Sequence, residues 1–271
     1  MHARSALFDV YGDHLRWRGG VAPVASLVRL LAPLDVSPAA VRTGISRMVR
    51  QGWLAPVRLP EGAGYELTER AERRLDEAHA RIYRTTPSAG WDAPWDGRWH
   101  LVVLERPGNR PDRERVEAAM RYLGYASLST PPSNGTWVAP RPSPELAAML
   151  GAEQIKAQAF TAEHEGDPAE LVAQAWDLAP VARAYEQWTA MARVLLKEAG
   201  PEPDDETAFA VRFQLVHEWR KFLFIDPALP AALLPEDWPG RQAAQIFDEA
   251  AQSLRAAADR FVDDCLDPRS D

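Results

Sequence analysis

The segment VRTGISRMVR, residues 41–50, carries cations and hydroxyl groups at a spacing that suits contact with a nucleic acid. On a helix with about 100° between successive residues, its polar side chains share one face. These polar residues are Arg42, Thr43, Ser46, Arg47 and Arg50. Guanidinium and hydroxyl groups without an acid among them can bind phosphates and read base edges in a DNA groove. The structural alternative is an amphipathic surface helix whose arginines are solvated.

The sequence around this segment provides signals for a helix and for the elements beside it. Ser37 suits the N-cap and Pro38 the first turn, and Gly52 suits the C-terminal stop. Two helices are expected before it, at 5–14 and 24–32. Residues 54–65 predict a β-hairpin, with Arg58 near its tip, and a charged helix follows at 69–83. This order is that of a winged helix-turn-helix.

Composition and charge limit the class of protein. The 271-residue chain has a net charge of −8, which normally argues against a nucleic-acid partner. However, residues 1–84 carry 13 Lys/Arg and 9 Asp/Glu, whereas the remaining 187 residues carry 18 and 30. Such asymmetry fits a DNA-binding module joined to an acidic body. With Cys265 as its single cysteine, and with no signal peptide or membrane span expected, the protein is expected to be soluble and cytoplasmic.

The rest of the chain predicts two further parts. Residues 98–166 show strand, helix, strand, strand, helix, strand, which is a ferredoxin-like βαββαβ unit. The expected elements are 98–105, 111–123, 126–129, 135–140, a helix capped by Ser143 to about 150, and 154–162. After them, helices are expected at 171–176, 178–199, 206–224 and 242–265, with an irregular segment at 226–240. The predicted fold class is multidomain α+β.

Taken together, these residues resemble the PaaX family, the repressors of phenylacetate-degradation genes. The N-terminal and middle residues that carry the resemblance are Tyr11-Gly12-Asp13, Ser26–Leu31, Ala40–Thr43, Arg47, Gly52-Trp53-Leu54, Tyr65–Thr68, Trp95 and Gly97-Arg98-Trp99. The C-terminal residues are the most specific: Arg212, His217, Trp219-Arg220-Lys221, Asp226-Pro227, Leu229-Pro230, Leu234-Pro235, Trp238-Pro239-Gly240 and Ala243. One departure is Gly44, because glycine within a helix costs about 0.5–1 kcal/mol relative to alanine. It marks either a close backbone approach or a changed operator preference.

The resemblance implies a homodimeric repressor that leaves double-stranded operator DNA when it binds an aryl-CoA thioester such as phenylacetyl-CoA. The implied division is a winged helix-turn-helix DNA-binding domain at 1–84, a linker at 85–97, a ferredoxin-like domain at 98–166 and a helical effector-binding and dimerisation domain at 167–271. The cations and aromatic groups that such an effector needs are expected at Arg212, His217, Trp219, Arg220, Lys221, Tyr185 and Trp188. A structural ion pair between Arg220 and Asp226 is the alternative for those two residues.

Two alternatives to a ligand-controlled regulator belong to other classes of function. A metal-dependent nuclease would use Glu105, which ends the first strand of the ferredoxin-like unit, but one carboxylate is weak support for metal catalysis. An architectural DNA-binding protein would keep the dimer and lack the ligand. No catalytic motif, metal site or cofactor is expected.

Overall fold

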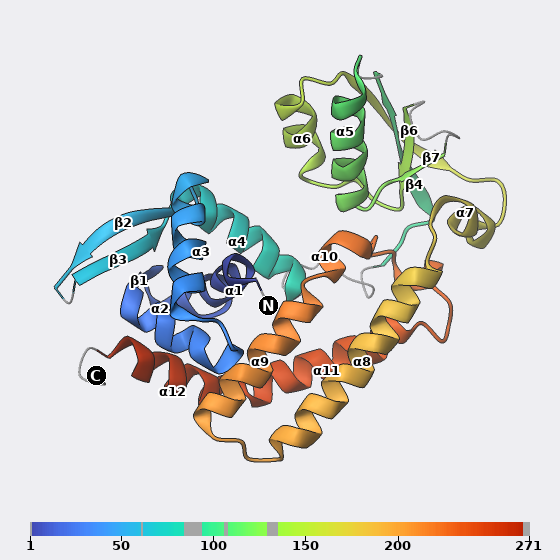
Figure 1. The fold of residues 1–271 in the computed structure, drawn as a ribbon. Coiled ribbons are helices and arrows are strands. Elements are labelled where there is room, and N and C mark those ends of the chain that lie inside the picture. Colours follow the sequence, from blue (N-terminus) through green and yellow to red (C-terminus); the bar gives the residue numbers. More distant parts are fainter. Residues whose placement is uncertain (1, 61, 84–93, 106–107, 129–134, 268–271) are drawn as a thin grey trace. The chain divides into compact units, whose positions relative to one another are not determined.

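The structure is a computed structural model that describes residues 2–60, 62–83, 94–105, 108–128 and 135–267 (Figure 1). Its contacts divide the chain into two compact units. Unit 1 comprises residues 1–85, 186–220 and 240–271, and unit 2 comprises 86–185 and 221–239. Most of the predicted linker lies outside the described residues. The three-domain division stays a prediction, since the compact units combine the N-terminal part with two pieces of the C-terminal part.

Unit 1 contains the predicted helices and hairpin. Its N-terminal elements are α1 (Ala3–Val10), β1 (Val21–Pro23), α2 (Val24–Leu31), α3 (Pro38–Arg50), β2 (Leu54–Leu59), β3 (Gly62–Leu67) and α4 (Glu69–Ile82). A π-helical turn at Tyr11–Leu15 follows α1. The strands form an antiparallel sheet in the order β1-β3-β2, and the pairing of β1 with β3 was not predicted. From the C-terminal part come the second portion of α8 (Ala179–Ala199), α9 (Asp205–Trp219), α11 (Pro239–Ser253) and α12 (Arg255–Leu266).

The ends of α3 follow from the local sequence as predicted. The Ser37 hydroxyl accepts a hydrogen bond from the Ala40 N–H at 3.3 Å, which satisfies one of the free donors of the first turn. Pro38 occupies the first helical position, where it has no N–H to lose. Gly52 has a φ of +70°, a left-handed conformation that glycine adopts without strain, and it ends the helix ahead of the hairpin.

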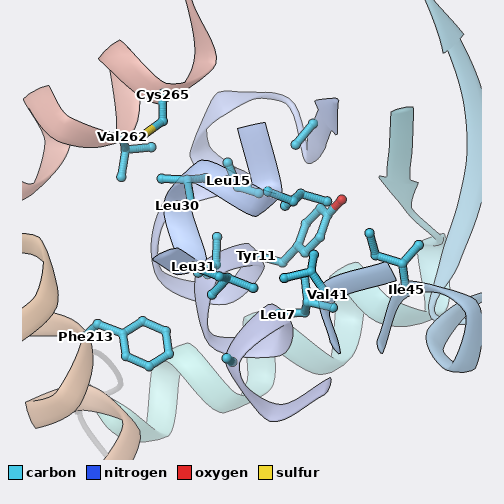
Figure 2. Close-up of a cluster of buried hydrophobic side chains, with 14 of the residues drawn as sticks. Leu7, Tyr11, Leu15, Leu30, Leu31, Val41, Ile45, Phe213, Val262 and Cys265 are labelled. Carbon is cyan, nitrogen blue, oxygen red and sulfur yellow. The ribbon is translucent and has the colours of Figure 1, made fainter. Parts of the chain in front are cut away.

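The core of unit 1 is shared between the two ends of the chain. Leu7 and Tyr11 pack with Leu30 of α2 and Val41 of α3, all fully buried (Figure 2). The C-terminal helices complete this core through Phe213 of α9 and through Val262 and Cys265 of α12. The three N-terminal helices therefore bury their apolar faces partly against segments that lie about two hundred residues further along the chain.

Unit 2 contains the predicted ferredoxin-like unit. Its elements are β4 (Arg98–Leu104), α5 (Arg110–Tyr122), β5 (Ala126–Ser127), β6 (Thr136–Ala139), α6 (Leu146–Ala152) and β7 (Ala157–Glu163). The strands pair antiparallel in the order β5-β6-β4-β7. This element and strand order confirms the βαββαβ prediction. One sheet face packs on α5 and α6, and the other packs on α7 (Pro168–Ala175) and the segment around Leu229 and Leu233.

Several predicted boundaries were wrong. The helix expected at 206–224 ends at Trp219 and is followed by a separate short helix, α10 (Phe222–Ile225). The helix expected at 242–265 begins at Pro239 and is two helices, α11 and α12, divided at Leu254. Neither break carries a glycine or proline. At the first break Arg220 pairs with Asp9 of α1, and at the second Leu254 is buried. Ser143 organises the turn before α6, which starts only at Leu146.

Candidate nucleic-acid interface and the ion pairs behind it

The predicted polar face of α3 is exposed. Arg42, Thr43, Ser46, Arg47 and Arg50 all lie on the solvent side of the helix. The Thr43 hydroxyl donates to the Ala39 carbonyl at 2.9 Å, and the Ser46 hydroxyl donates to the Arg42 carbonyl at 3.0 Å. Both hydroxyl oxygens keep acceptor capacity for a donor outside the protein.

The arginines of this face have no acidic partner in the part of the chain that the structure describes. Arg42, Arg47 and Arg50 form no ion pair with any described residue, and neither does Arg58, which is exposed on β2 near the hairpin turn. Elsewhere in unit 1, arginines such as Arg18 and Arg212 are held by carboxylates. A set of exposed, uncompensated guanidinium groups on a helix and an adjacent hairpin can bind a polyanion.

Gly44 is buried in α3, where α1 packs against it. A Cβ atom at this position would lie 2.9 Å from Leu7 Cδ1 and 3.3 Å from the backbone nitrogen of Arg4. Both distances are shorter than ordinary van der Waals contact. The geometry therefore supports a close backbone approach as the reason for a glycine at position 44, and not a changed operator preference.

Behind α3, α1 is held by a buried carboxylate. Asp9 accepts a hydrogen bond from His217 Nδ1 at 2.5 Å and pairs with Arg220 Nε at 2.9 Å, both at the end of α9. Arg220 also donates to the Ser5 hydroxyl. Burial raises the pKa of Asp9, and the hydrogen bond from His217 and the charge of Arg220 lower that pKa only in part.

A second buried carboxylate lies one helical turn further on. Asp13 pairs with Arg212 Nη2 at 3.0 Å and accepts a hydrogen bond from the Tyr83 hydroxyl at 2.5 Å. Arg212 also donates to the Ala251 carbonyl. Burial alone would raise the pKa of Asp13, but the adjacent His14, Arg212 and Tyr83 together lower it. Asp13 therefore links the N-terminal helices to α4, α9 and α11.

The predicted effector residues occupy two different settings. Arg212, His217 and Arg220 contact the buried aspartates of α1 and the turn after it. Trp188 and Trp219 belong to an aromatic cluster of unit 1, in which Trp219 stacks on Phe247 at 4.6 Å. Their indole N–H groups donate to the Leu215 and Ile82 carbonyls.

The remaining two predicted effector residues, Tyr185 and Lys221, belong to unit 2. Tyr185 stacks on Phe222 at 3.9 Å and donates to the Asp226 carboxylate. The predicted effector set is therefore not one cluster within either unit.

Sequence reasoning assigned neither Asp9 nor Asp13 to a site, although Asp13 is among the residues that carry the family resemblance. The signal for them was two acids spaced four residues apart on the first, otherwise apolar helical segment, where a buried charge requires a partner. Glu105, the acid of the nuclease alternative, is exposed after β4. Among the described residues, no three His, Cys, Asp or Glu side chains gather as a metal site would require. Over the same residues, no helix is long and apolar enough to cross a membrane.

The chain is similar to known proteins over nearly its whole length. Transcriptional repressor PaaX of Escherichia coli (strain K12) is 30% identical to this chain, in an alignment that covers 95% of this chain and 82% of that protein. Family models match along the chain: PaaX-like protein over 2–71, the PaaX protein central Cas2-like domain over 92–172 and the PaaX-like protein C-terminal domain over 176–264. The protein is a transcriptional regulator. It belongs to the PaaX family.

A solved structure extends the similarity to the fold. Uncharacterized protein Rv0674 from Mycobacterium tuberculosis matches with a TM-score of 0.60 and 26% sequence identity. The match covers 96% of this chain and 98% of that one.

Proposed function

We propose that this protein is a DNA-binding repressor whose residues 1–84 act as a winged helix-turn-helix, with α3 in the major groove of operator DNA. The observation that carries the proposal is the exposed face of α3, on which three arginines have no acidic partner among the described residues. The hairpin of β2 and β3, which follows α3 directly, is the wing in this proposal. The similarity to a protein named as a transcriptional repressor supports the same function.

In this proposal, the position of each residue along α3 decides whether it contacts a base edge or a phosphate. Recognition helices enter the groove with their N-terminal residues first, so Arg42 and Thr43 contact base edges. Arg50, at the C-terminal end of α3, and Arg58, on the hairpin, contact phosphates. Ser46 and Arg47 lie between these groups on the same face and complete the interface.

Binding of alanine variants to a DNA duplex selected with the wild-type protein tests this assignment. Arg42→Ala should weaken binding to the selected duplex by about 1–3 kcal/mol, or about 5- to 150-fold, and relax the sequence preference at one position. Arg50→Ala should weaken binding to all duplexes alike. Arg193→Ala on α8 removes an exposed arginine that also lacks an ion pair with any described residue, and it should change neither. Unchanged affinity of Arg42→Ala would refute the role of α3.

The finer part of the proposal is a homodimer that represses an aromatic-acid catabolic operon and is released by an aryl-CoA thioester. The family resemblance supports it. In this proposal, the phosphates of the thioester compete with Asp9 and Asp13 for Arg220 and Arg212, and His217 lies beside Arg220 on Asp9. Asp9 anchors α1 through its ion pair with Arg220, and α1 packs against α3, so this competition would change the position of α3.

Operator footprinting with a panel of CoA thioesters and their free acids tests ligand control. A protected region with two symmetric half-sites is expected for a dimer, and only thioesters should remove the protection. Release by a free acid alone would refute the thioester. Metal-dependent cleavage of the DNA that is lost in Glu105→Ala would instead favour the nuclease alternative.

A further inference from the structure

We propose that Arg4 of α1 and Arg70 of α4 contact DNA phosphates on the flanks of α3, and so extend the interface beyond the recognition helix and the hairpin. This inference rests on the proposed function, because it adds contacts to the same DNA-binding surface. Neither residue was a candidate from the sequence. Both lie exposed on unit 1.

A row of aromatic rings joins the two arginines. The guanidinium carbon of Arg4 lies 5.9 Å from the ring centroid of Phe8, and that of Arg70 lies 4.3 Å from the ring centroid of Trp53. Phe8 and Trp53 meet edge to face, with their centroids 5.2 Å apart. Stacking on a partly buried ring restricts a long cationic side chain while its head group stays in water. The guanidinium groups are thus pre-positioned at the surface.

The row runs alongside α3. The backbone nitrogen of Arg4 is 3.3 Å from the position that a Cβ on Gly44 would take, which places α1 directly beside the middle of α3. Arg70 Nη1 donates to the carbonyl of Gln51, the C-cap residue of α3, at 3.5 Å. A helix that occupies the major groove is bordered by the two phosphate backbones, and cations beside such a helix fix its register by contacting them.

The local charges leave both guanidinium groups available. In the described part of the chain, neither Arg4 nor Arg70 forms an ion pair. Glu69, the acidic neighbour of Arg70 in sequence, is paired with Arg73 at 2.5 Å. Several other arginines of unit 1 differ from this pattern, because carboxylates neutralise them: Arg16 by Asp76, Arg18 by Asp259 and Asp263, Arg212 by Asp13, Arg220 by Asp9 and Arg260 by Asp205.

The salt dependence of DNA binding by the full-length protein tests the inference. Arg4→Gln and Arg70→Gln are made singly and together, and Arg193→Gln serves as the matched control. Each variant is titrated with the selected duplex and with an unrelated duplex of equal length at several salt concentrations. Each lost phosphate contact should reduce the slope of log affinity against log salt by about 0.9. The double variant should therefore lose about 2 from the slope on both duplexes, and the control should lose none.

The outcomes distinguish this inference from the function on which it rests. If the wild type binds neither duplex, the proposed function fails. If the wild type binds and the double variant keeps the wild-type slope, only the phosphate contacts are refuted. Because glutamine could also disturb the stacking on Phe8 and Trp53, Arg4→Lys with Arg70→Lys is the second variant. It keeps both charges and should restore the slope, whereas a slope that stays low would indicate a structural role and refute the inference.

Discussion

Replacing Gly44 with alanine, at the contact between α1 and α3, has two effects of opposite sign on the free energy of unfolding. Alanine favours the helix over glycine by about 0.5–1 kcal/mol. The new methyl group, however, would lie 2.9 Å from Leu7 Cδ1, 3.3 Å from the nitrogen of Arg4 and 3.4 Å from the carbonyl carbon of Ala3. Leu7 is fully buried and cannot turn into solvent, and the other two atoms belong to the backbone. Overpacking of this kind costs about 1–3 kcal/mol.

The steric cost therefore exceeds the helix gain, and Gly44→Ala should lower the free energy of unfolding by about 1 kcal/mol. In a protein of this size that corresponds to a fall in Tm of about 2–4 °C. Gly151 in α6 provides the matched control, since it is also a helical glycine but has no atom within 4 Å of its added Cβ. Gly151→Ala should be neutral or stabilising. Urea denaturation followed by circular dichroism measures both variants.

The same substitution also tests the proposed function, because relieving the clash requires α1 and α3 to separate by a few tenths of an ångström. Binding to the selected duplex should weaken more than binding to an unrelated duplex, because base contacts depend on the helix position more strictly than phosphate contacts do. A Gly44→Ala protein that is more stable than the wild type, by the full helix gain, would refute the close approach of α1. If the Gly44→Ala protein is more stable than the wild type and also prefers a different DNA sequence, Gly44 is explained by operator preference.

The buried aspartates give two further predictions. Asp13→Asn should cost about 3–5 kcal/mol by urea denaturation, since it leaves the buried Arg212 without a countercharge. Asp9→Asn should lower the free energy of unfolding by only about 1–2 kcal/mol, because burial already raises the pKa of Asp9 and because the Arg220 side chain is 27% exposed. Equal losses of stability in the Asp13→Asn and Asp9→Asn proteins would contradict this difference. The pKa of Asp13 is lowered in the fold, so its ionised form stabilises the fold at pH values above the ordinary aspartate pKa of about 4. This stabilisation is lost as the pH falls through the lowered pKa. Denaturation between pH 6 and pH 3 should therefore show a fall in stability below about pH 4 that Asp13→Asn flattens, and an unflattened profile would assign the fall to other groups.

Local signals were enough to predict most elements of this fold, because each feature that was predicted depends on neighbours in sequence. The cap at Ser37, the stop at Gly52 and the hairpin predicted at 54–65 are set by a few residues each, and all were confirmed, with the hairpin extending to Leu67. The division at Leu254 and the end of α9 at Trp219 were missed because no glycine or proline marks either break in the sequence.

The same reasoning explains the outcome for the candidate sites. The exposed face of α3 was predictable because helical periodicity alone determines it, and every residue assigned to it is exposed. The partners of Arg212 and Arg220 were not predictable, since Asp13 and Asp9 lie about two hundred residues away in the chain. In the sequence, a cation on a C-terminal helix has the same pattern whether its partner in the fold is an anionic ligand or a buried carboxylate of the protein.

The position of α1 connects these two kinds of feature. One side of α1 packs against α3 so closely that residue 44 has no room for a methyl group, and Asp9 on α1 is bound by His217 and Arg220 of the α9 end. A buried carboxylate cannot easily remain without its cations, since the uncompensated charge is costly in the interior. Any event that draws Arg220 or Arg212 away from the aspartates must therefore loosen α1, and with it the support of the recognition surface. Regulation of the proposed DNA contact thus requires no long pathway through the protein, because α1 lies between the C-terminal cations His217 and Arg220 and the helix α3, whose arginines face solvent.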